Sequence, residues 1–256
     1  MSLLAVDDLT LKFGGVTALE NVRFSVEAGE LFAVIGPNGA GKTSIFNCLN
    51  GVYRPQRGSM RFDGTELVGR RPPAIARLGI ARTFQNLGLF VQLDVIDNLM
   101  LGRHVRMRTG FLSGMAWLGR ARREEIANRR RVEEIIELLG LEPFRYEPVG
   151  TLPYGIQKRI ELGRALAMDP KLLLLDEPVA GMNLEETEDM ARLVLDVRRE
   201  LDLTMILVEH DLQLVMELAD RVLVLDFGEA IALGTPADVQ SDPRVIAAYL
   251  GQEQLS

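Results

Sequence analysis

The sequence feature that most restricts the possible folds is a glycine-rich turn, GPNGAGKTS, at residues 36–44. It follows a short apolar run at 31–35, which is typical of a buried strand, and it precedes a segment at 42–49 with helical character. The turn matches G-x-x-x-x-G-K-[ST], in which glycines let successive backbone N–H groups point at phosphate oxygens. A chance glycine-rich turn with a lysine would rarely match every fixed position in this strand-to-helix context. The pattern therefore predicts a nucleoside triphosphate site.

Each residue type in this turn has an expected task. Lys42 is expected to reach the β- and γ-phosphates, the Thr43 hydroxyl to bind Mg²⁺, and Ser44 to add a phosphate hydrogen bond. The N-terminus of the following helix contributes a partial positive charge. The predicted nucleotide-binding residues of the turn are Gly36, Pro37, Asn38, Gly39, Ala40, Gly41, Lys42, Thr43 and Ser44.

A pair of carboxylates ends a second apolar run, KLLLLDEP, at residues 171–178. Ligands of α/β sheets bind beyond the carboxyl ends of parallel strands. Asp176 is suited to bind Mg²⁺ through a coordinated water, and Glu177 is suited to act as general base on the attacking water. The pair followed by Pro178 is also typical of a helix N-cap. The phosphate-binding turn favours the catalytic interpretation.

Two more polar side chains follow predicted strands. His210 comes after the run at 204–208, where it can contact the γ-phosphate and hold the attacking water, or merely cap the next helix. Gln85 comes after a short strand at 80–84, and its amide can reach Mg²⁺ or the attacking water. In isolation neither residue would indicate a function.

The order of elements indicates a single α/β domain. Strand, helix and strand at 171–176, 184–201 and 204–208 imply a parallel sheet. Residues 120–139 have helical periodicity, which suggests a helical subdomain at about 87–159 inserted into a core formed by 1–86 and 160–256. Other strands are predicted at 3–6, 21–26, 31–35 and 59–62.

Composition excludes several classes of protein. Of 256 residues, 47% are hydrophobic and 25% charged, which suits a large core and excludes disordered chains and disulfide scaffolds. The single cysteine, Cys48, has apolar helical neighbours and is expected to be a buried structural thiol. No apolar run approaches the roughly 20 residues of a membrane span. With no secretion signal recognised at the N-terminus and a net charge of −7, we expect a cytoplasmic protein that does not bind nucleic acid.

Together these elements resemble the ATP-binding-cassette (ABC) ATPases over essentially the whole chain. The resemblance implies an ATPase that uses ATP and Mg²⁺. It also implies a P-loop NTPase fold of the α/β class, with a RecA-like parallel-sheet core, an N-terminal antiparallel β subdomain and an inserted α-helical subdomain. The ordered elements that carry it are Phe13, residues 36–44, Gln85, the signature stretch at 152–170, the strand and glutamate at 172–177, the loop at 179–183, and His210. Phe13, where the family usually has tyrosine, would stack on adenine.

The signature is the part that departs from the family. The pattern LSGGQ aligns with LPYGI at 152–156, so that Pro153 replaces the serine that binds the γ-phosphate and Ile156 replaces the glutamine. Asn183 stands where the family usually has aspartate. Either this half of the dimer contributes less to its partner's site, or backbone contacts suffice. The residues expected to face the partner's nucleotide are Pro153, Tyr154, Gly155, Ile156 and Gln157.

Several stretches resemble one branch, the ATPase subunits of bacterial branched-chain amino-acid importers. The resemblance implies a peripheral subunit on the inner face of the cell membrane. Its partners would be a second ABC ATPase subunit in a homo- or heterodimer, two transmembrane permease subunits and, indirectly, an external solute-binding protein. The stretches are LKFGGVTAL, GPNGAGKTSIFNCLNGVYRP, ARTFQNLGLF, DEPVAGMN, VEHDLQLVMELADRVLVLDFGEAIALGTP and DPRVIAAYLG.

Other members of the family remain alternatives at this point. The ATPases of urea and amide importers and of lipopolysaccharide export share many of these marks. A soluble cassette ATPase with a regulatory role is an alternative from a different class. Cassette ATPases that act on DNA or ribosomes usually carry two cassettes or a long coiled coil, and neither is present in 256 residues.

The charge is distributed unevenly along the chain. Residues 103–131 contain nine arginines and two acidic residues, a formal charge of +7 that leaves −14 on the rest. One interpretation is that these arginines meet anionic lipid or acidic permease loops, beside an apolar surface. The other is a solvated basic helix whose apolar residues pack within their own subdomain. The apolar residues concerned are Met107, Phe111, Leu112, Met115, Trp117 and Leu118.

Overall fold

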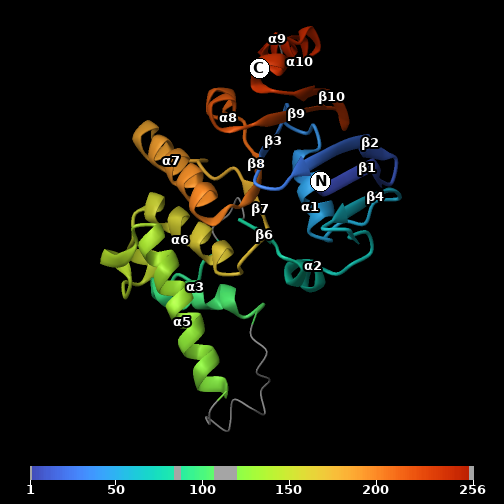
Figure 1. Cartoon of the computed structure of the whole chain (residues 1–256). Coiled ribbons are helices and arrows are strands. Elements are labelled where there is room, and N and C mark those ends of the chain that lie inside the picture. Colours follow the sequence, from blue (N-terminus) through green and yellow to red (C-terminus); the bar gives the residue numbers. More distant parts are fainter. Residues whose placement is uncertain (1, 84–87, 107–119, 254–256) are drawn as a thin grey trace.

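Two β-sheets organise the chain (Figure 1). The structure, a computed structural model, describes residues 2–83, 88–106 and 120–253. One sheet is antiparallel and has the order β2-β1-β4-β5. Its strands are β1 (Ser2–Phe13), β2 (Val16–Glu27), β4 (Arg57–Phe62) and β5 (Thr65–Glu66).

The second sheet has six strands in the order β10-β9-β3-β8-β7-β6. All neighbours in it run parallel except β10, which pairs antiparallel with β9 at the edge. This arrangement confirms the predicted α/β class with a parallel core. The strands are β3 (Leu31–Ile35), β6 (Ile80–Arg82), β7 (Leu172–Asp176), β8 (Thr204–Val208), β9 (Arg221–Asp226) and β10 (Glu229–Gly234).

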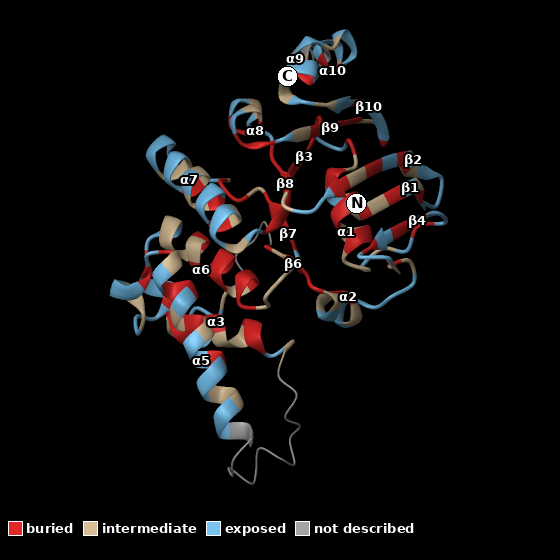
Figure 2. Ribbon diagram, viewed as in Figure 1, coloured by how far each residue is buried: buried red, intermediate tan, exposed pale blue. Residues whose placement is uncertain are grey.

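The central strands are apolar along their whole length because both faces of the parallel sheet are covered (Figure 2). In β3, Leu31, Ala33 and Ile35 pack in the core shared with the helices. Phe32 and Val34 point to the opposite face, into the core shared with the antiparallel sheet. Strict alternation of polar and apolar residues is therefore absent from these strands, and unbroken apolar runs take its place.

The first two strands are much longer than their sequence pattern predicts. Strands were expected at 3–6 and 21–26, but β1 and β2 have 12 residues each and join at the turn Gly14-Gly15. Asp8 and Asn21 adopt φ angles of 55° and 50°, and the register shifts near both residues. The bulge at Asp8 shifts the phase of the alternation, because the buried positions change from Leu4 and Val6 to Leu9 and Leu11. No single period of two therefore runs through the whole strand, and a pattern search ends it early.

Helices cover the sheets and form the segment between β6 and β7. That segment contains α3 (Val95–Arg103), α5 (Arg120–Leu138), two 3₁₀ turns (Glu142–Phe144 and Val149–Thr151) and α6 (Tyr154–Leu166). Position 159 falls inside α6, which leads the chain back to the sheet. Among the described helices none is both long and apolar enough to cross a membrane. The others are α1 (Lys42–Leu49), α2 (Pro72–Leu78), α7 (Leu184–Leu201), α8 (Leu212–Leu218), α9 (Pro236–Ser241) and α10 (Pro243–Glu253).

Three arginines of the basic segment hold the C-terminal end of α6. The buried guanidinium of Arg103 donates to the Ala167 carbonyl and pairs with the Asp169 carboxylate. Arg106 donates to the Asp169 carbonyl at 2.7 Å, and Arg131 donates to the Asp169 carboxylate at 2.9 Å. Cationic side chains at a helix C-terminus satisfy carbonyls that lack intrahelical partners.

Neither interpretation of the basic segment describes these three residues. They are neither lipid-facing nor solvated charges, because they bind groups of this chain, at Asn128 and at residues 167–169. Arg122, Arg123 and Arg130 are exposed, which leaves both interpretations open for them. The six apolar positions proposed as a contact surface, between 107 and 118, lie outside the described residues.

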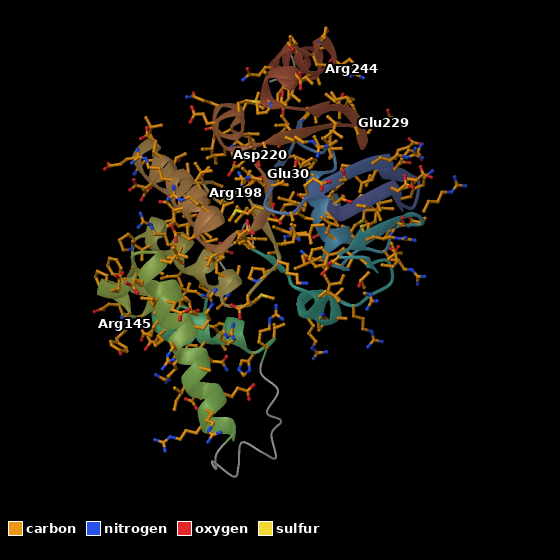
Figure 3. All side chains as sticks on the ribbon, viewed as in Figure 1. Glu30, Arg145, Arg198, Asp220, Glu229 and Arg244 are labelled. Carbon is orange, nitrogen blue, oxygen red and sulfur yellow. The ribbon has the colours of Figure 1, made fainter. Side chains whose placement is uncertain are left out.

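A network of charged residues fixes the N-terminal end of β3. Asp220 accepts from the backbone N–H of Leu31 at 2.8 Å and from Arg198 at 2.6 Å. Glu30 accepts from Arg221 at 3.2 Å, and Figure 3 shows Glu30, Arg198 and Asp220 gathered at this end of the sheet. The network anchors the strand at the end away from its glycine-rich turn, which leaves the carboxyl end of β3 to form the candidate site.

Cys48 lies in α1 with 1% of its surface exposed. Burial raises the pKa of its thiol to about 12. The expectation of a buried structural cysteine is confirmed.

Candidate nucleotide site

The glycine-rich turn connects β3 to α1 as the sequence predicts, and two of its glycines are required by close packing. Gly36 has φ 149°, and a Cβ there would collide with the Leu225 carbonyl of β9. Gly41 has φ 107°, and a Cβ there would lie 2.7 Å from the Ala18 carbonyl of β2. No side chain caps the N-terminus of α1, whose first-turn N–H groups are the anion-binding feature of such turns.

Lys42 folds over the turn that precedes it. Its buried ammonium group donates to the Gly36 carbonyl at 2.5 Å and to the Pro37 carbonyl at 3.0 Å. Burial lowers the pKa of Lys42, and the charge of Glu177 opposes that effect. The structure thus brings Lys42 and Glu177 into electrostatic contact. Thr43 is exposed and Ser44 is half-buried.

Asp176 at the end of β7 is paired with an arginine that sequence reasoning missed. Arg82 of β6 donates to the Asp176 carboxylate at 2.5 Å and to Asn47 at 2.7 Å, and both charged side chains are less than a tenth exposed. Thr83 accepts from the backbone N–H of Asp176 at 3.2 Å. The predicted residue Gln85 lies outside the described residues, two positions beyond Thr83. Since a salt bridge depends on the strand order β6-β7, no local sequence signal could identify it.

Glu177 does not cap a helix, so the N-cap alternative for Asp176 and Glu177 is wrong. The next helix, α7, begins only at Leu184, and Asn183 caps it. Glu177 has φ 48°, and its backbone N–H donates to the Val208 carbonyl of β8 at 2.9 Å. The side chain therefore leaves the strand at a sharp turn beside the loop that follows β8.

Asn183, which stands where the family resemblance leads one to expect aspartate, forms a capping box. Its side chain accepts from the Glu186 N–H at 3.0 Å, and the Glu186 carboxylate accepts from the Asn183 N–H at 3.1 Å. We expect Asn183→Ala to lower the free energy of unfolding by about 1 kcal/mol, measured by urea denaturation. Asn183→Asp should retain the cap, and an equal loss in both variants would contradict this role.

His210 does not cap a helix either. Asp211 caps α8 by accepting from the Leu214 N–H at 3.1 Å, so the capping alternative for His210 is wrong. The imidazole is 64% exposed and lies beside Glu209, which is fully buried. His210 and Glu177 thus end neighbouring parallel strands, β8 and β7.

The signature residues lie at the start of α6, and most of their side chains have partners within the chain. Tyr154 donates to the Ala180 carbonyl, in the loop after β7, at 3.0 Å. Gln157 donates to the Leu152 carbonyl at 2.8 Å, and Ile156 packs against the core. Pro153 precedes the first turn of the helix, which no side chain caps. The backbone N–H groups of this first turn, which includes Gly155, are therefore donors that no capping side chain occupies.

Phe13 lies at the end of β1 with 47% of its surface exposed. Its ring meets Tyr53 edge-on, with the ring centroids 5.0 Å apart. The β1-β2 hairpin that carries Phe13 also packs against Gly41 through Ala18 and Leu19. An aromatic ring is therefore presented by the same hairpin that borders the phosphate-binding turn.

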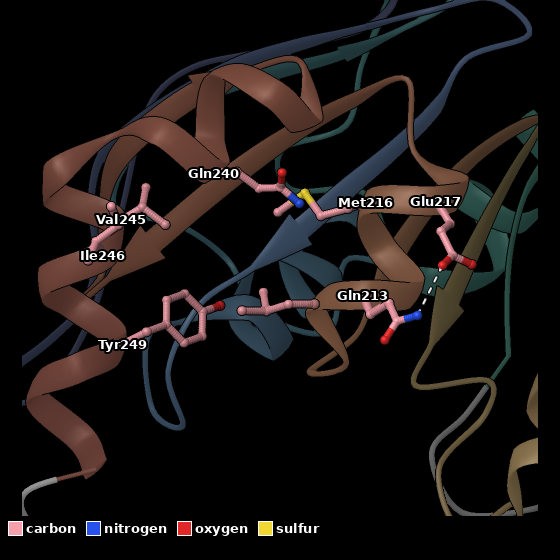
Figure 4. A pocket seen from close by; sticks show the side chains of 8 residues that line it. Gln213, Met216, Glu217, Gln240, Val245, Ile246 and Tyr249 are labelled. Carbon is pink, nitrogen blue, oxygen red and sulfur yellow. Dashed lines mark hydrogen bonds between the residues drawn. The ribbon is translucent and has the colours of Figure 1, made fainter.

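An apolar cavity lies elsewhere, between α8 and the C-terminal helices (Figure 4). It has a volume of about 500 Å³ and is lined by Met216, Ile246 and Tyr249 among others. None of the sequence-predicted residues lines it. Apolar lining does not suit a triphosphate, so the cavity does not compete with the turn at 36–44 as the nucleotide site.

The donor set at this sheet edge fits a magnesium ion that is shared with phosphates. In the described part of the chain no three His, Cys, Asp or Glu side chains cluster as a self-sufficient metal site. Mg²⁺ typically binds through one or two protein oxygens and completes its shell with water and phosphate oxygens. The Thr43 hydroxyl, in the first turn of α1, and the Asp176 carboxylate, at the end of β7, are such oxygens.

Comparison with known proteins agrees with this geometry. Residues 19–180, from β2 to the loop after β7, match the family model described as ABC transporter. The chain belongs to the ABC transporter family. A second model, described as branched-chain amino acid ATP-binding cassette transporter, matches residues 231–254. The fold predicted from the resemblance and the ATPase class are both confirmed.

Curated relatives of this ABC ATPase match over nearly their whole length. The high-affinity branched-chain amino acid transport ATP-binding protein BraF of Pseudomonas aeruginosa is 41% identical over 98% of each chain. LivG of Salmonella typhimurium and LivG of Escherichia coli, with the same description, are 40% and 39% identical over the same share. The predicted branch, the ATPase subunits of branched-chain amino-acid importers, is thereby confirmed as the group that this chain resembles.

Solved ABC cassettes share the fold. The ADP conformation of an ATP-binding cassette of an ABC transporter superposes with a TM-score of 0.85 at 29% identity, covering 98% of this chain and 99% of the other. A nucleotide-free cassette gives 0.83 at 28% identity, covering 97% and 99%. The chain is thus an ATP-binding subunit with the ABC ATPase fold, built around the turn at 36–44.

Proposed function

We propose that this ABC ATPase powers the import of branched-chain amino acids. The observation that carries the proposal is the match to BraF and LivG at about 40% identity over 98% of both chains. The C-terminal match at residues 231–254, to the branched-chain amino acid cassette model, supports it independently. We infer that the subunit lies on the inner face of the cell membrane.

The partners follow from the same proposal. The subunit pairs with a second ABC ATPase, identical or homologous, and binds two transmembrane permeases that receive substrate from an external solute-binding protein. Each ATP lies between the phosphate-binding turn of one ATPase and the signature of the other. The uncapped first turn of α6 and Gly155 support a signature that contacts phosphate through its backbone.

The roles at the site follow from chemistry. Lys42 and the N–H groups at the start of α1 bind the β- and γ-phosphates, and Phe13 stacks on the adenine. Thr43, Asp176 and Gln85 hold Mg²⁺, which supplies charge neutralisation on the phosphates when bound. Glu177 accepts a proton from the attacking water, and His210 orients that water against the γ-phosphate. Arg82 supports this assignment, because it fixes the Asp176 carboxylate at the end of β7.

Transport decides the substrate class. The experiment reconstitutes the chain with its permeases and binding protein in liposomes, with ATP on the side of the ATPase, and measures uptake of radiolabelled leucine. We expect ATP-dependent uptake of leucine. Unlabelled isoleucine and valine should compete with leucine and reduce this uptake, and urea should not. Uptake of urea or amides with no leucine uptake would place the chain in the related importer group, and co-purification with lipopolysaccharide-export permeases would place it in that system.

The adenine contact gives a separate prediction. Phe13→Ala should weaken ATP binding by about 1–2 kcal/mol, roughly a 5- to 30-fold rise in Kd, because one stacking face is lost. Phe13→Tyr keeps the ring and should bind ATP within about twofold of the parent. Titration with a fluorescent ATP analogue measures both, and equal affinity in Phe13→Ala would exclude the stacking role.

A further inference from the structure

Glu209 is a fully buried carboxylic acid that the proposed mechanism does not use. It lies between the last residue of β8 and His210. One carboxylate oxygen, Oε1, accepts from the backbone N–H of Val179 at 3.2 Å. The other, Oε2, accepts from the backbone N–H of His210 at 3.1 Å and lies 3.5 Å from Nδ1 of the same imidazole.

These contacts join two loops that carry catalytic groups. Val179 belongs to the loop that follows Glu177, and His210 begins the loop that follows β8. Just before these loops, the backbone N–H of Glu177 donates to the carbonyl of Val208, the last residue of β8, at 2.9 Å. The Glu209 side chain therefore links the two loops just beyond the ends of β7 and β8, where the hydrogen bonds between these strands have ended.

The contact with Nδ1 also bears on the chemistry of the histidine. In a neutral imidazole one nitrogen carries the proton and the other accepts, and the partner of one nitrogen decides which. A carboxylate beside Nδ1 favours a proton there, which leaves Nε2 available as an acceptor. The imidazole is 64% exposed, and its Nδ1 lies within ion-pair distance of the carboxylate.

We propose that Glu209 is the positioning residue for His210, fixing both the tautomer of its imidazole and its distance from the loop of Glu177. The inference rests on the role of His210 proposed above. Glu209 touches neither nucleotide nor water in this scheme and acts only through the histidine and the loop. Carboxylates and backbone carbonyls are common partners of one ring nitrogen in functional histidines, and they set which nitrogen carries the proton.

The contacts of Glu209 offset the cost of its burial only in part. The pKa of its carboxyl group is raised, because burial outweighs the N–H groups of Val179 and His210 and the charge of His210, which lower it. The charge of Glu177 acts in the same direction as burial. An unneeded carboxylic acid at a fully buried position would be costly, and leucine or valine would pack there without that cost.

The test replaces Glu209 with glutamine, which keeps the shape but exchanges one acceptor oxygen for an NH₂ donor. The chain has only two histidines, His104 and His210, so that the imidazole ¹⁵N signals of both can be followed by NMR in the full chain. We expect Glu209→Gln to move the Nδ1 and Nε2 signals of His210 toward the other tautomer. The signals of His104, at the end of α3, are the internal control and should not move.

Activity in the assembled transporter gives the second measurement. We expect kcat for ATP hydrolysis to fall by about 10- to 100-fold in Glu209→Gln, with KM for ATP within about twofold. His210→Ala separates this inference from the proposed mechanism. If His210→Ala hydrolyses ATP normally, the role of His210 fails, whereas the NMR result still decides whether Glu209 positions it.

Each outcome is informative. Unchanged His210 signals in Glu209→Gln overturn the proposal whatever the activity. If both histidines shift and the melting temperature falls, Glu209→Asp decides, because it retains the carboxylate. Recovery of the parental His210 signals in Glu209→Asp supports the positioning role, and no recovery overturns it.

Discussion

Glu177→Gln is expected to lower ATP turnover of the assembled transporter by at least about 100-fold while ATP affinity stays within about twofold. Glutamine preserves the size of the side chain and cannot accept the proton of the attacking water. The backbone at this position has φ 48° and donates to the Val208 carbonyl, so that the side chain is held at the sheet edge by backbone contacts that the substitution leaves intact.

Single-turnover hydrolysis and equilibrium ATP binding should be measured on the same preparation. Glu185→Gln is the matched control, because Glu185 is exposed in the first turn of α7 and lies only eight positions away. It should hydrolyse ATP at the parental rate. Turnover in Glu177→Gln equal to that of Glu185→Gln would show that another group acts as base.

The second large effect concerns stability. Arg103→Met should lower the free energy of unfolding by about 2–4 kcal/mol, measured by urea denaturation at neutral pH. Methionine keeps the apolar stem of the side chain and removes the guanidinium. The Asp169 carboxylate and the Ala167 carbonyl then lose a buried donor. The expected loss is smaller than for a fully buried pair, because Asp169 is 39% exposed.

Acid should remove most of this difference. Burial opposes the charge of Asp169, but hydrogen bonds and charges from Arg103 and Arg131 outweigh it and hold its pKa below the ordinary value of 3.8. A carboxylate with a lowered folded-state pKa stabilises the protein fully above its unfolded pKa and loses that contribution as the pH falls through the folded value. The difference in stability between Arg103→Met and the parent should therefore narrow as the pH falls below 3.8, and the part that remains reports the bonds of Arg103 to Ala167 and Asn128.

Arg130→Met is the control for this experiment. Arg130 lies on the same helix as Arg131 but is exposed, so its loss should change the free energy of unfolding by less than about 0.5 kcal/mol. A comparable loss in Arg130→Met would mean that the overall charge of the basic segment stabilises the fold. The specific contacts with the end of α6 would then not explain the effect.

Helices, strands and turns were predicted most accurately from the sequence where residues close together in the chain determine the structure. The bounds of β3, α1, α7 and β8 agree with the prediction to the residue. Unbroken apolar runs define the two strands, the glycine-rich turn sets the start of α1, and a capping box starts α7. The phosphate-binding turn was predictable for the same reason, since its glycines and lysine are adjacent in the chain. The outer halves of β1 and β2 were missed because bulges at Asp8 and Asn21 conceal their period.

What could not be predicted depends on contacts between distant segments. The Arg82–Asp176 pair joins residues 94 positions apart, and the Arg103–Asp169 pair joins residues 66 apart. From the sequence alone both arginines would be expected at the surface, and only the fold shows that they are buried. Glu209 was overlooked for a related reason, because an acidic residue beside a histidine in a polar stretch gives no sign of complete burial.

The buried thiol of Cys48 makes this chain convenient for chemical labelling. As the only cysteine, with a pKa of about 12, it should stay unmodified by maleimides at neutral pH while the fold is intact. A cysteine introduced on the surface can then carry a spectroscopic probe without first removing the native one. Because Cys48 lies on the helix that begins with Lys42, its slow modification also reports how often that helix opens. Bound ATP should slow that modification, which offers a label-based measure of nucleotide binding in the unmodified protein.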